Sequence, residues 1–284
     1  MNKSLLDFSD KIDPISIEIY QAICEIAIDT PWYVIGAQAR DLYLEHKYDI
    51  KNLRRTRDFD LAIQVKDWEE FESLKTSLLE NAEFKNSAEP HRLYFKSNIP
   101  VDIIPFGGLA NKDRQITWPQ DGTEMSVIGF QDVLQAAEFV VLRRDPDLQI
   151  RFATPAGLCV LKVIAWSDRP IERGKDIEDL YDIMTNYIHF DNWDRLDEEH
   201  SDLRDTNDFN EIYVGCQMLG RDIANITSED TLNFLITILE AEISKGIGSA
   251  LLPHLQRKFS DDNTNEPMIY IENLVEGLRF RNKK

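Results

Sequence analysis

The pattern of apolar residues changes near residue 153, and this change constrains the fold more than any other feature of the sequence. Before it, short runs that alternate polar and apolar residues are interleaved with amphipathic segments of helical period. After it, strand-like runs almost vanish and helical periodicity dominates. The sequence therefore predicts an α/β (α+β) domain with a small mixed sheet over residues 1–150, followed by a mainly α-helical domain over residues 151–284.

The predicted elements of the first domain follow from the spacing of apolar residues and from the turn residues that separate the segments. Strands are expected at residues 32–36, 58–65, the two halves of 92–106, 124–130 and the two arms of a hairpin over 139–153. Helices are expected at residues 15–28, 37–47, 68–82 and 131–138. The glycine at position 36 ends one strand and opens a helix, so the chain turns sharply there.

Composition excludes several classes of protein. The chain carries 32 Lys and Arg against 51 Asp and Glu, a formal net charge of −19. A negative field weakens attraction to phosphates, so a long nucleic-acid duplex is not an expected partner. No apolar stretch is long enough for a membrane span and no signal-peptide pattern opens the sequence, so we expect a cytoplasmic protein. The three widely spaced cysteines show neither a disulfide framework nor a CxxC metal spacing.

Asp58 and Asp60 carry the strongest chemical signal. They flank Phe59 at the start of an expected strand, where alternation places both carboxylates on one face. Neighbouring carboxylates raise each other's pKa unless a cation neutralises them, and Mg²⁺ prefers carboxylate oxygens together with substrate phosphates. Asp102 lies in an apolar strand, where a charged carboxylate is costly unless it is paired or metal-bound. If the two strands are neighbours, three carboxylates meet at one point, although a lone Asp-x-Asp is also common on exposed strand edges.

Two further features favour a phosphate ligand beside these acids. Gly36 begins a helix, whose first amide groups and dipole favour an anion such as a triphosphate. Arg55, Thr56 and Arg57 directly precede the acids and supply guanidinium and hydroxyl donors for phosphate oxygens. Each feature alone has a simpler interpretation, close strand–helix packing for the glycine and a solvated basic loop for the other three residues.

These residues together resemble the minimal nucleotidyltransferases of the polymerase-β superfamily. The resemblance rests on WYVIGAQARDLYL (32–44), RRTRDFDLAI (54–63) and VDII (101–104), and it is strongest to the AbiEii/AbiGii-type toxin nucleotidyltransferases. A second block, residues 154–183, resembles the helical segment that follows the catalytic head in the same proteins. Residues 190–284 match no family.

The resemblance implies a magnesium-dependent enzyme with two bound ions, Mn²⁺ being an alternative to Mg²⁺. Asp58 and Asp60 would bind both ions, and Asp102 would complete the site of the ion that activates the acceptor hydroxyl. The implied nucleotide- or phosphate-binding residues are Gly36, Ala37, Arg40, Thr56, Arg57, Lys162 and Lys175. The Arg40-Asp41-Leu42 run is also similar to the head domain of tRNA CCA-adding enzymes.

Two positions in this resemblance have a second interpretation. The family turn usually reads Gly-Gly or Gly-Ser, so Ala37 loses a hydroxyl and places a β-carbon near the phosphates. Lys175 stands at helical spacing with Asp176 and Asp179, and an ion-pair set explains these residues as well as a catalytic role does.

Two functional hypotheses follow. The first is a two-metal nucleotidyltransferase that moves a nucleoside monophosphate (NMP) from a nucleoside triphosphate (NTP) onto an acceptor hydroxyl of a tRNA end, a protein side chain or a small molecule. The toxin-like resemblance implies a role in a toxin–antitoxin or phage-defence system, with an antitoxin protein as partner. The second hypothesis is a catalytically silent nucleotide-binding or interaction module of the same fold, which the alanine at position 37 favours.

Overall fold

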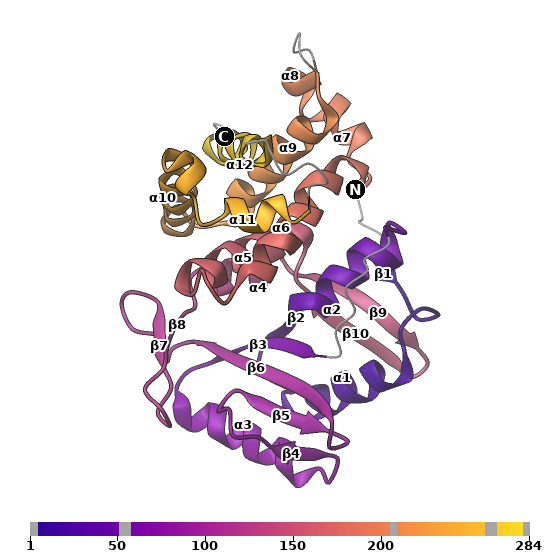
Figure 1. The fold of residues 1–284 in the computed structure, drawn as a ribbon. Coiled ribbons are helices and arrows are strands. Elements are labelled where there is room, and N and C mark those ends of the chain that lie inside the picture. The colour runs from indigo at the N-terminus through magenta and orange to yellow at the C-terminus, as the bar shows by residue number, and fades with distance from the viewer. Residues whose placement is uncertain (1–4, 51–57, 205–208, 259–265, 281–284) are drawn as a thin grey trace. The chain divides into compact units, whose positions relative to one another are not determined.

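The computed structural model describes the chain apart from residues 1–4, 51–57, 205–208, 259–265 and 281–284 (Figure 1). Contacts between residues divide the chain into two compact units, residues 1–154 and 155–284. Each unit has its own buried apolar core.

An eight-stranded mixed sheet forms the centre of the first unit (Figure 1). Its strands, in spatial order, are β1 (Leu6–Asp7), β9 (Glu138–Arg144), β10 (Asp147–Phe152), β2 (Trp32–Ile35), β3 (Phe59–Val65), β6 (Ile99–Gly107), β5 (Arg92–Phe95) and β4 (Phe84–Asn86). A separate two-stranded ladder joins β7 (Gln115–Thr117) to β8 (Glu124–Ser126). The mixed sheet was predicted, but its small size was wrong. The edge strands β1 and β4 are two and three residues long, too short to show a period of two in the sequence.

The helices of the first unit follow the predicted segments closely. They are α1 (Pro14–Ile26), α2 (Gly36–Asp41), its π-helical continuation η1 (Leu42–Lys47), α3 (Trp68–Glu80) and α4 (Phe130–Ala136). The side chain of Asp13 caps α1 by accepting from the amide of Ser16, and Asp67 caps α3 in the same way at Glu70. The switch to π-helix at Leu42 was not predicted, because apolar spacing does not separate the two helix types over six residues.

Aromatic side chains pack on both faces of the sheet and show which residues of each strand point to which face. Tyr20 of α1 contacts the rings of Phe59 and Phe152 edge-on, with centroid distances of 5.7 and 5.8 Å. On the opposite face, Tyr33 packs against Phe106 at 6.1 Å. Because side chains alternate along β3, burial of Phe59 under α1 forces its neighbour Asp60 onto the other face.

The second unit is helical throughout the residues that the structure describes (Figure 1). Its elements are α5 (Pro155–Asp168), α6 (Gly174–Asn186), η2 (Tyr187–His189), α7 (Trp193–Glu198), α8 (Ser201–Arg204), α9 (Glu211–Ile226), α10 (Glu229–Ser244), η3 (Gly246–Gly248), α11 (Leu252–Gln256) and α12 (Glu266–Arg279). The side chain of Ser228 caps α10 by accepting from the amide of Thr231.

Two glycines allow α9 and α12 to approach closely. A β-carbon on Gly277 would lie 2.1 Å from the carbonyl oxygen of Gln217, and one on Gly220 would lie 2.3 Å from that of Leu274. No side chain fits at either distance, so the backbones of the two helices are in direct contact there.

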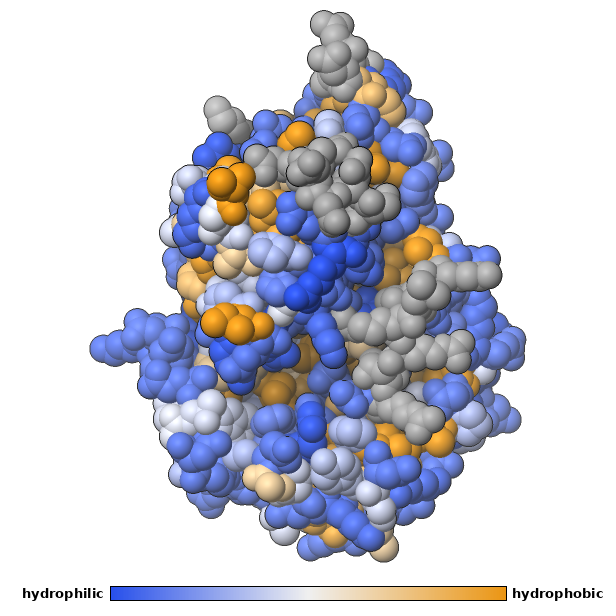
Figure 2. All heavy atoms as spheres, in the orientation of Figure 1, coloured by the Kyte–Doolittle hydropathy of each residue, from blue (hydrophilic) through white to orange (hydrophobic). Residues whose placement is uncertain are grey.

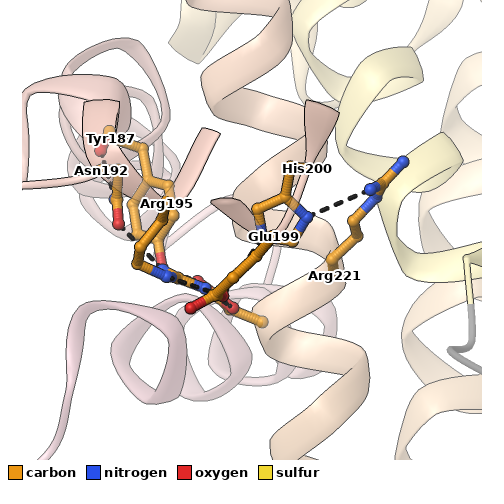
Figure 3. A network of polar contacts seen from close by, with 7 residues as sticks. Tyr187, Asn192, Arg195, Glu199, His200 and Arg221 are labelled. Carbon is orange, nitrogen blue, oxygen red and sulfur yellow. Dashed lines mark hydrogen bonds and ion pairs between the residues drawn. The ribbon is translucent and has the colours of Figure 1, made fainter. Parts of the chain in front are cut away.

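A polar network that the sequence did not reveal fastens α7 to α9 (Figure 3). Arg195 donates to both carboxylate oxygens of Asp222 at 2.7 and 2.8 Å, and the hydroxyl of Tyr187 donates to the same carboxylate. Burial, and then the neighbouring Asp222, raises the pKa of Tyr187 well above its ordinary value. The network is therefore a partly buried set of hydrogen bonds that links α7, η2 and α9.

His200 belongs to the same region (Figure 3) and is held in its neutral form. Its side chain is buried, with Nδ1 3.1 Å from the guanidinium of Arg221, which also donates to both oxygens of Asp202 and lies over the ring of Phe280. Burial lowers the pKa of His200, and the nearby positive charges of Arg195 and Arg221 lower it further. A neutral imidazole accepts a hydrogen bond from Arg221, whereas an imidazolium would repel it.

The surface is that of a charged, polar protein. Figure 2 shows hydrophilic residues over most of the face in view, with separate small apolar patches. Among the residues that the structure describes, every helix is too short or too polar to cross a lipid bilayer.

Candidate active site

The structure brings Asp60 and Asp102 side by side. Strands β3 and β6 are parallel, and Asp60 and Asp102 are partners in the register. Paired residues of neighbouring strands point to the same face and lie about 4.8 Å apart. The sequence left open whether the two strands are neighbours, and the register confirms that they are. Asp58 directly precedes β3 and is half-buried.

Gly36 lies against the carboxylate of Asp60. The last residue of β2, Ile35, pairs with Asp60, and the chain then turns into α2 through Gly36, whose φ is +65°. A β-carbon at this position would lie 2.0 Å from Oδ2 of Asp60. The turn therefore needs glycine twice, for its left-handed backbone and for the space that the carboxylate fills. The Asp60 carboxylate thus lies at the start of α2, where a helix favours negative charge.

Arg92 is a neighbour of Asp102 that the sequence reasoning missed. It pairs with Asp102 across the antiparallel strands β5 and β6, and its Nε and Nη2 donate to Oδ1 and Oδ2 of that carboxylate at 2.7 and 2.8 Å. These hydrogen bonds raise the pKa of Arg92 above its already high ordinary value. The two strands expected within residues 92–106 form a hairpin whose loop is residues 96–98, and this register places residue 92 opposite residue 102.

Neighbouring groups fix the segment that carries Arg92. The Nζ of Lys75 on α3 donates to the carbonyl of Pro90 at 2.7 Å, and the amide of Ile103 donates to the carbonyl of His91 at 2.8 Å. The His91 ring packs at 5.7 Å from the ring of Trp118, and its Nε2 lies 4.0 Å from Oδ2 of Asp102. Asp102 thus lies beside the cationic side chain of Arg92 and the titratable side chain of His91, at the start of β5.

The donor set suits a hard divalent cation. Carboxylate oxygens are the ligands that Mg²⁺ prefers, and the space left by the missing β-carbon of Gly36 keeps the Asp60 carboxylate at the turn. Within the described ranges, no three His, Cys, Asp or Glu side chains are gathered as ligands around one point. At Asp102, both carboxylate oxygens accept hydrogen bonds from Arg92. Metal binding by Asp58, Asp60 and Asp102 stays a prediction.

The other predicted phosphate-binding residues differ in their surroundings. Ala37 is buried in the first turn of α2. Arg40 is fully buried and pairs with Asp41, its Nε lying 2.8 Å from Oδ1, so its guanidinium contributes to the packing of α2. Lys175 is exposed on the first turn of α6. Thr56 and Arg57 lie outside the described residues.

Lys162 forms the centre of a buried ion-pair set between two helices of the second unit. Its Nζ on α5 lies 2.5 Å from Oδ2 of Asp179 and 3.3 Å from Oδ1 of Asp176, both on α6. The side chains of Lys162 and Asp179 are 7% and 3% exposed. Loss of one partner would leave a buried charge unpaired, at a cost of about 3–5 kcal/mol. These contacts favour the ion-pair interpretation of this motif, with Lys162 as its cation.

Comparison with known proteins gives no family assignment. No protein-family model matches the sequence, and no curated protein matches it significantly. Among solved structures, the antibiotic-resistance factor ANT(2'')-Ia superposes with a TM-score of 0.32 at 12% identity, covering 57% of this chain and 77% of its own. A CCA-adding enzyme in complex with ATP superposes with a TM-score of 0.29 at 13% identity, covering 95% and 82% of the two chains.

A third solved structure is the Thermotoga maritima CCA-adding enzyme in complex with tRNA. Its TM-score is 0.25 at 15% identity, over 95% of this chain and 82% of that enzyme. At these TM-scores and identities the superpositions carry no argument about activity, so the case for function rests on the residues themselves.

Proposed function

We propose that this protein is a nucleotidyltransferase that transfers an NMP from an NTP to an acceptor hydroxyl. The observation that carries the proposal is the pairing of Asp60 with Asp102 on neighbouring strands, directly beside the glycine turn that opens α2. Two carboxylates on one sheet face repel each other unless cations neutralise them, and Arg92 is one such cation at Asp102. A metal-bound triphosphate would supply further cations and place its phosphates at the amides of the turn.

Each side chain has a defined task in this proposal. Asp58 and Asp60 would hold the metal ions, and the amides of Gly36 and Ala37 would bind the triphosphate. When bound, the ions would lower the pKa of the acceptor hydroxyl and neutralise charge on the phosphates. Asp102 would orient the hydroxyl and take its proton. A bond then forms between the acceptor oxygen and the α-phosphorus, and the bond to pyrophosphate breaks.

The acceptor is the open part of the proposal. A tRNA end and a protein side chain are the acceptors that the toxin-like resemblance implies, and an antitoxin partner belongs with them. The net charge of −19 favours a compact acceptor or a protein over a long nucleic acid.

The second candidate function is a silent module that binds nucleotide without transferring it. Two observations favour it, the alanine at position 37 and the engagement of both Asp102 oxygens by Arg92. The position of Asp60 beside Asp102 favours the enzyme, because adjacent carboxylates are the ligands that a divalent ion with a bound triphosphate prefers.

The position of the transferred label tests the proposed function. The full chain is incubated with Mg²⁺, a cell extract as acceptor source, and each NTP labelled either at the α-phosphate or at the γ-phosphate. We expect α-label to appear on an acceptor and γ-label to appear only in pyrophosphate. Nucleotide binding without transfer would favour the silent module. Transfer of γ-label would identify a kinase-type reaction and contradict the proposal.

A further inference from the structure

His200 lies directly before α8, and its ring contacts α9 through Arg221 (Figure 3). The His200 side chain is only 6% exposed, and its Nδ1 lies 3.1 Å from Nη1 of the Arg221 guanidinium. A guanidinium donates hydrogen bonds and cannot accept them, so Nδ1 is the acceptor in this contact. The ring therefore carries its single proton on Nε2, and the contact requires the neutral form of the histidine.

A second proton on this ring would point at a positive charge. It would have to bind Nδ1, which faces the guanidinium of Arg221. Nε2 is buried as well and has no hydrogen-bond partner within the residues that the structure describes, and Oε2 of Glu199, at 3.9 Å, lies beyond hydrogen-bond distance. An imidazolium at this position would therefore lose its contact with Arg221 and stay poorly solvated.

The guanidinium of Arg221 also joins α8 to α9. Its side chain is 6% exposed and donates to both carboxylate oxygens of Asp202 on α8. A single nitrogen, Nη1, contacts both Nδ1 of His200 and Oδ1 of Asp202, at 3.1 and 2.9 Å. Movement of this nitrogen away from an imidazolium would therefore disturb its hydrogen bond to Asp202, so the state of the His200 ring is coupled to the attachment of α8.

Charged side chains face His200 from α7, α8 and α9. They are Arg195 and Glu199 at the end of α7, Asp202 on α8, and Arg221 and Asp222 on α9. Each of these carboxylates accepts a hydrogen bond from one of the two arginines. Burial lowers the pKa of His200 most, the two guanidinium charges lower it further, and the carboxylates offset this only in part. The surroundings therefore favour the neutral ring.

We propose that His200 is a pH-sensitive latch, which holds α8 against α9 while its ring is neutral and releases α8 when the ring is protonated. The inference is independent of the proposed function. In the open form the ring is in water and has the ordinary histidine pKa of 6.5, whereas the closed form resists the proton. The latch is therefore closed above pH 6.5, and the open form gains population as the pH falls below this value. Opening would expose Leu203 of α8, which is buried in the closed form.

Hydrogen exchange of residues 199–204 in the full chain tests the latch. The exchange is measured by mass spectrometry at pH 7.0 and pH 5.5 and expressed as protection factors, which correct for the intrinsic effect of pH on exchange. In the wild type we expect protection to fall roughly tenfold between the two pH values, since one proton is taken up on opening. In His200→Asn, whose side-chain oxygen can accept from Arg221 but does not titrate, protection should be nearly the same at both.

The matched control is His189→Asn, the same chemical change at an exposed histidine of η2. This variant should keep the tenfold change of the wild type. Equal pH dependence in the wild type and in His200→Asn would overturn the inference, and so would wild-type protection that does not change with pH. Should His200→Asn not fold, an NMR titration of the wild-type ring decides the matter. Protonation of His200 near pH 6.5 with undiminished protection of residues 199–204 would then contradict the latch.

Discussion

Asp60→Asn is expected to reduce NMP transfer on the order of 10³-fold, the largest effect of any single substitution in this chain. The change keeps the shape of the side chain and removes the charge that would hold the metal ions beside Gly36. A thousandfold loss corresponds to about 4 kcal/mol of transition-state stabilisation, the size that a pre-positioned electrostatic group supplies. The measurement is the initial rate of α-label transfer at saturating Mg²⁺ and NTP.

The melting temperature distinguishes a loss of transfer caused by the missing charge of Asp60 from a loss caused by damage to the fold. Asn keeps the size and shape of the Asp60 side chain, so the substitution leaves the packing of strand β3 in place. We therefore expect the melting temperature of Asp60→Asn to stay close to that of the wild type. Asp113→Asn, the same chemical change at an exposed position, should alter neither property. Full transfer activity in Asp60→Asn would remove this residue from the mechanism.

Gly36→Ala is expected to reduce transfer about 100-fold and to lower the free energy of unfolding by about 1–2 kcal/mol. The stability loss arises because alanine is strained at a φ of +65°. The activity loss arises because its β-carbon would overlap the Asp60 carboxylate, 2.0 Å away in the wild type, and would turn that group out of position. Transfer kinetics and urea denaturation measure the two losses separately.

Gly122→Ala is the matched control for this substitution. Gly122 also has a left-handed backbone, with φ of +73°, but a β-carbon there has no neighbour within 4 Å. It should lose similar stability and keep full transfer activity. Equal activity losses in the two variants would show that backbone strain, and not the position of Asp60, explains the effect of Gly36→Ala.

The sequence predicted those parts of the first unit that depend on local signals. The hairpin of β9 and β10 lies where two strand arms were expected over residues 139–153, and α1, α3 and α4 lie in segments with helical spacing of apolar residues. The opposed faces of Phe59 and Asp60 follow from alternation along one strand. Each of these features is decided within about ten residues of chain.

Features decided by distant contacts could not be predicted in this way. The pairing of Arg195 with Asp222 spans 27 residues and joins two helices whose packing no local period specifies. The close approach of α9 and α12 depends on Gly220 and Gly277, which in the sequence resemble ordinary helix-weakening glycines. Arg92 is an intermediate case, because the register of a hairpin locates it once the turn is known.

The central claim is that the face of β3 carrying Asp60 holds a metal-bound nucleotide beside Gly36. Equilibrium binding of a fluorescent, non-hydrolysable NTP analogue, with Mg²⁺ and then with excess EDTA, tests it most directly. We predict binding at least about tenfold tighter with Mg²⁺ than with EDTA in the wild type, and no such difference in Asp60→Asn. Binding that is indifferent both to EDTA and to this substitution, or no binding at all, would contradict the claim.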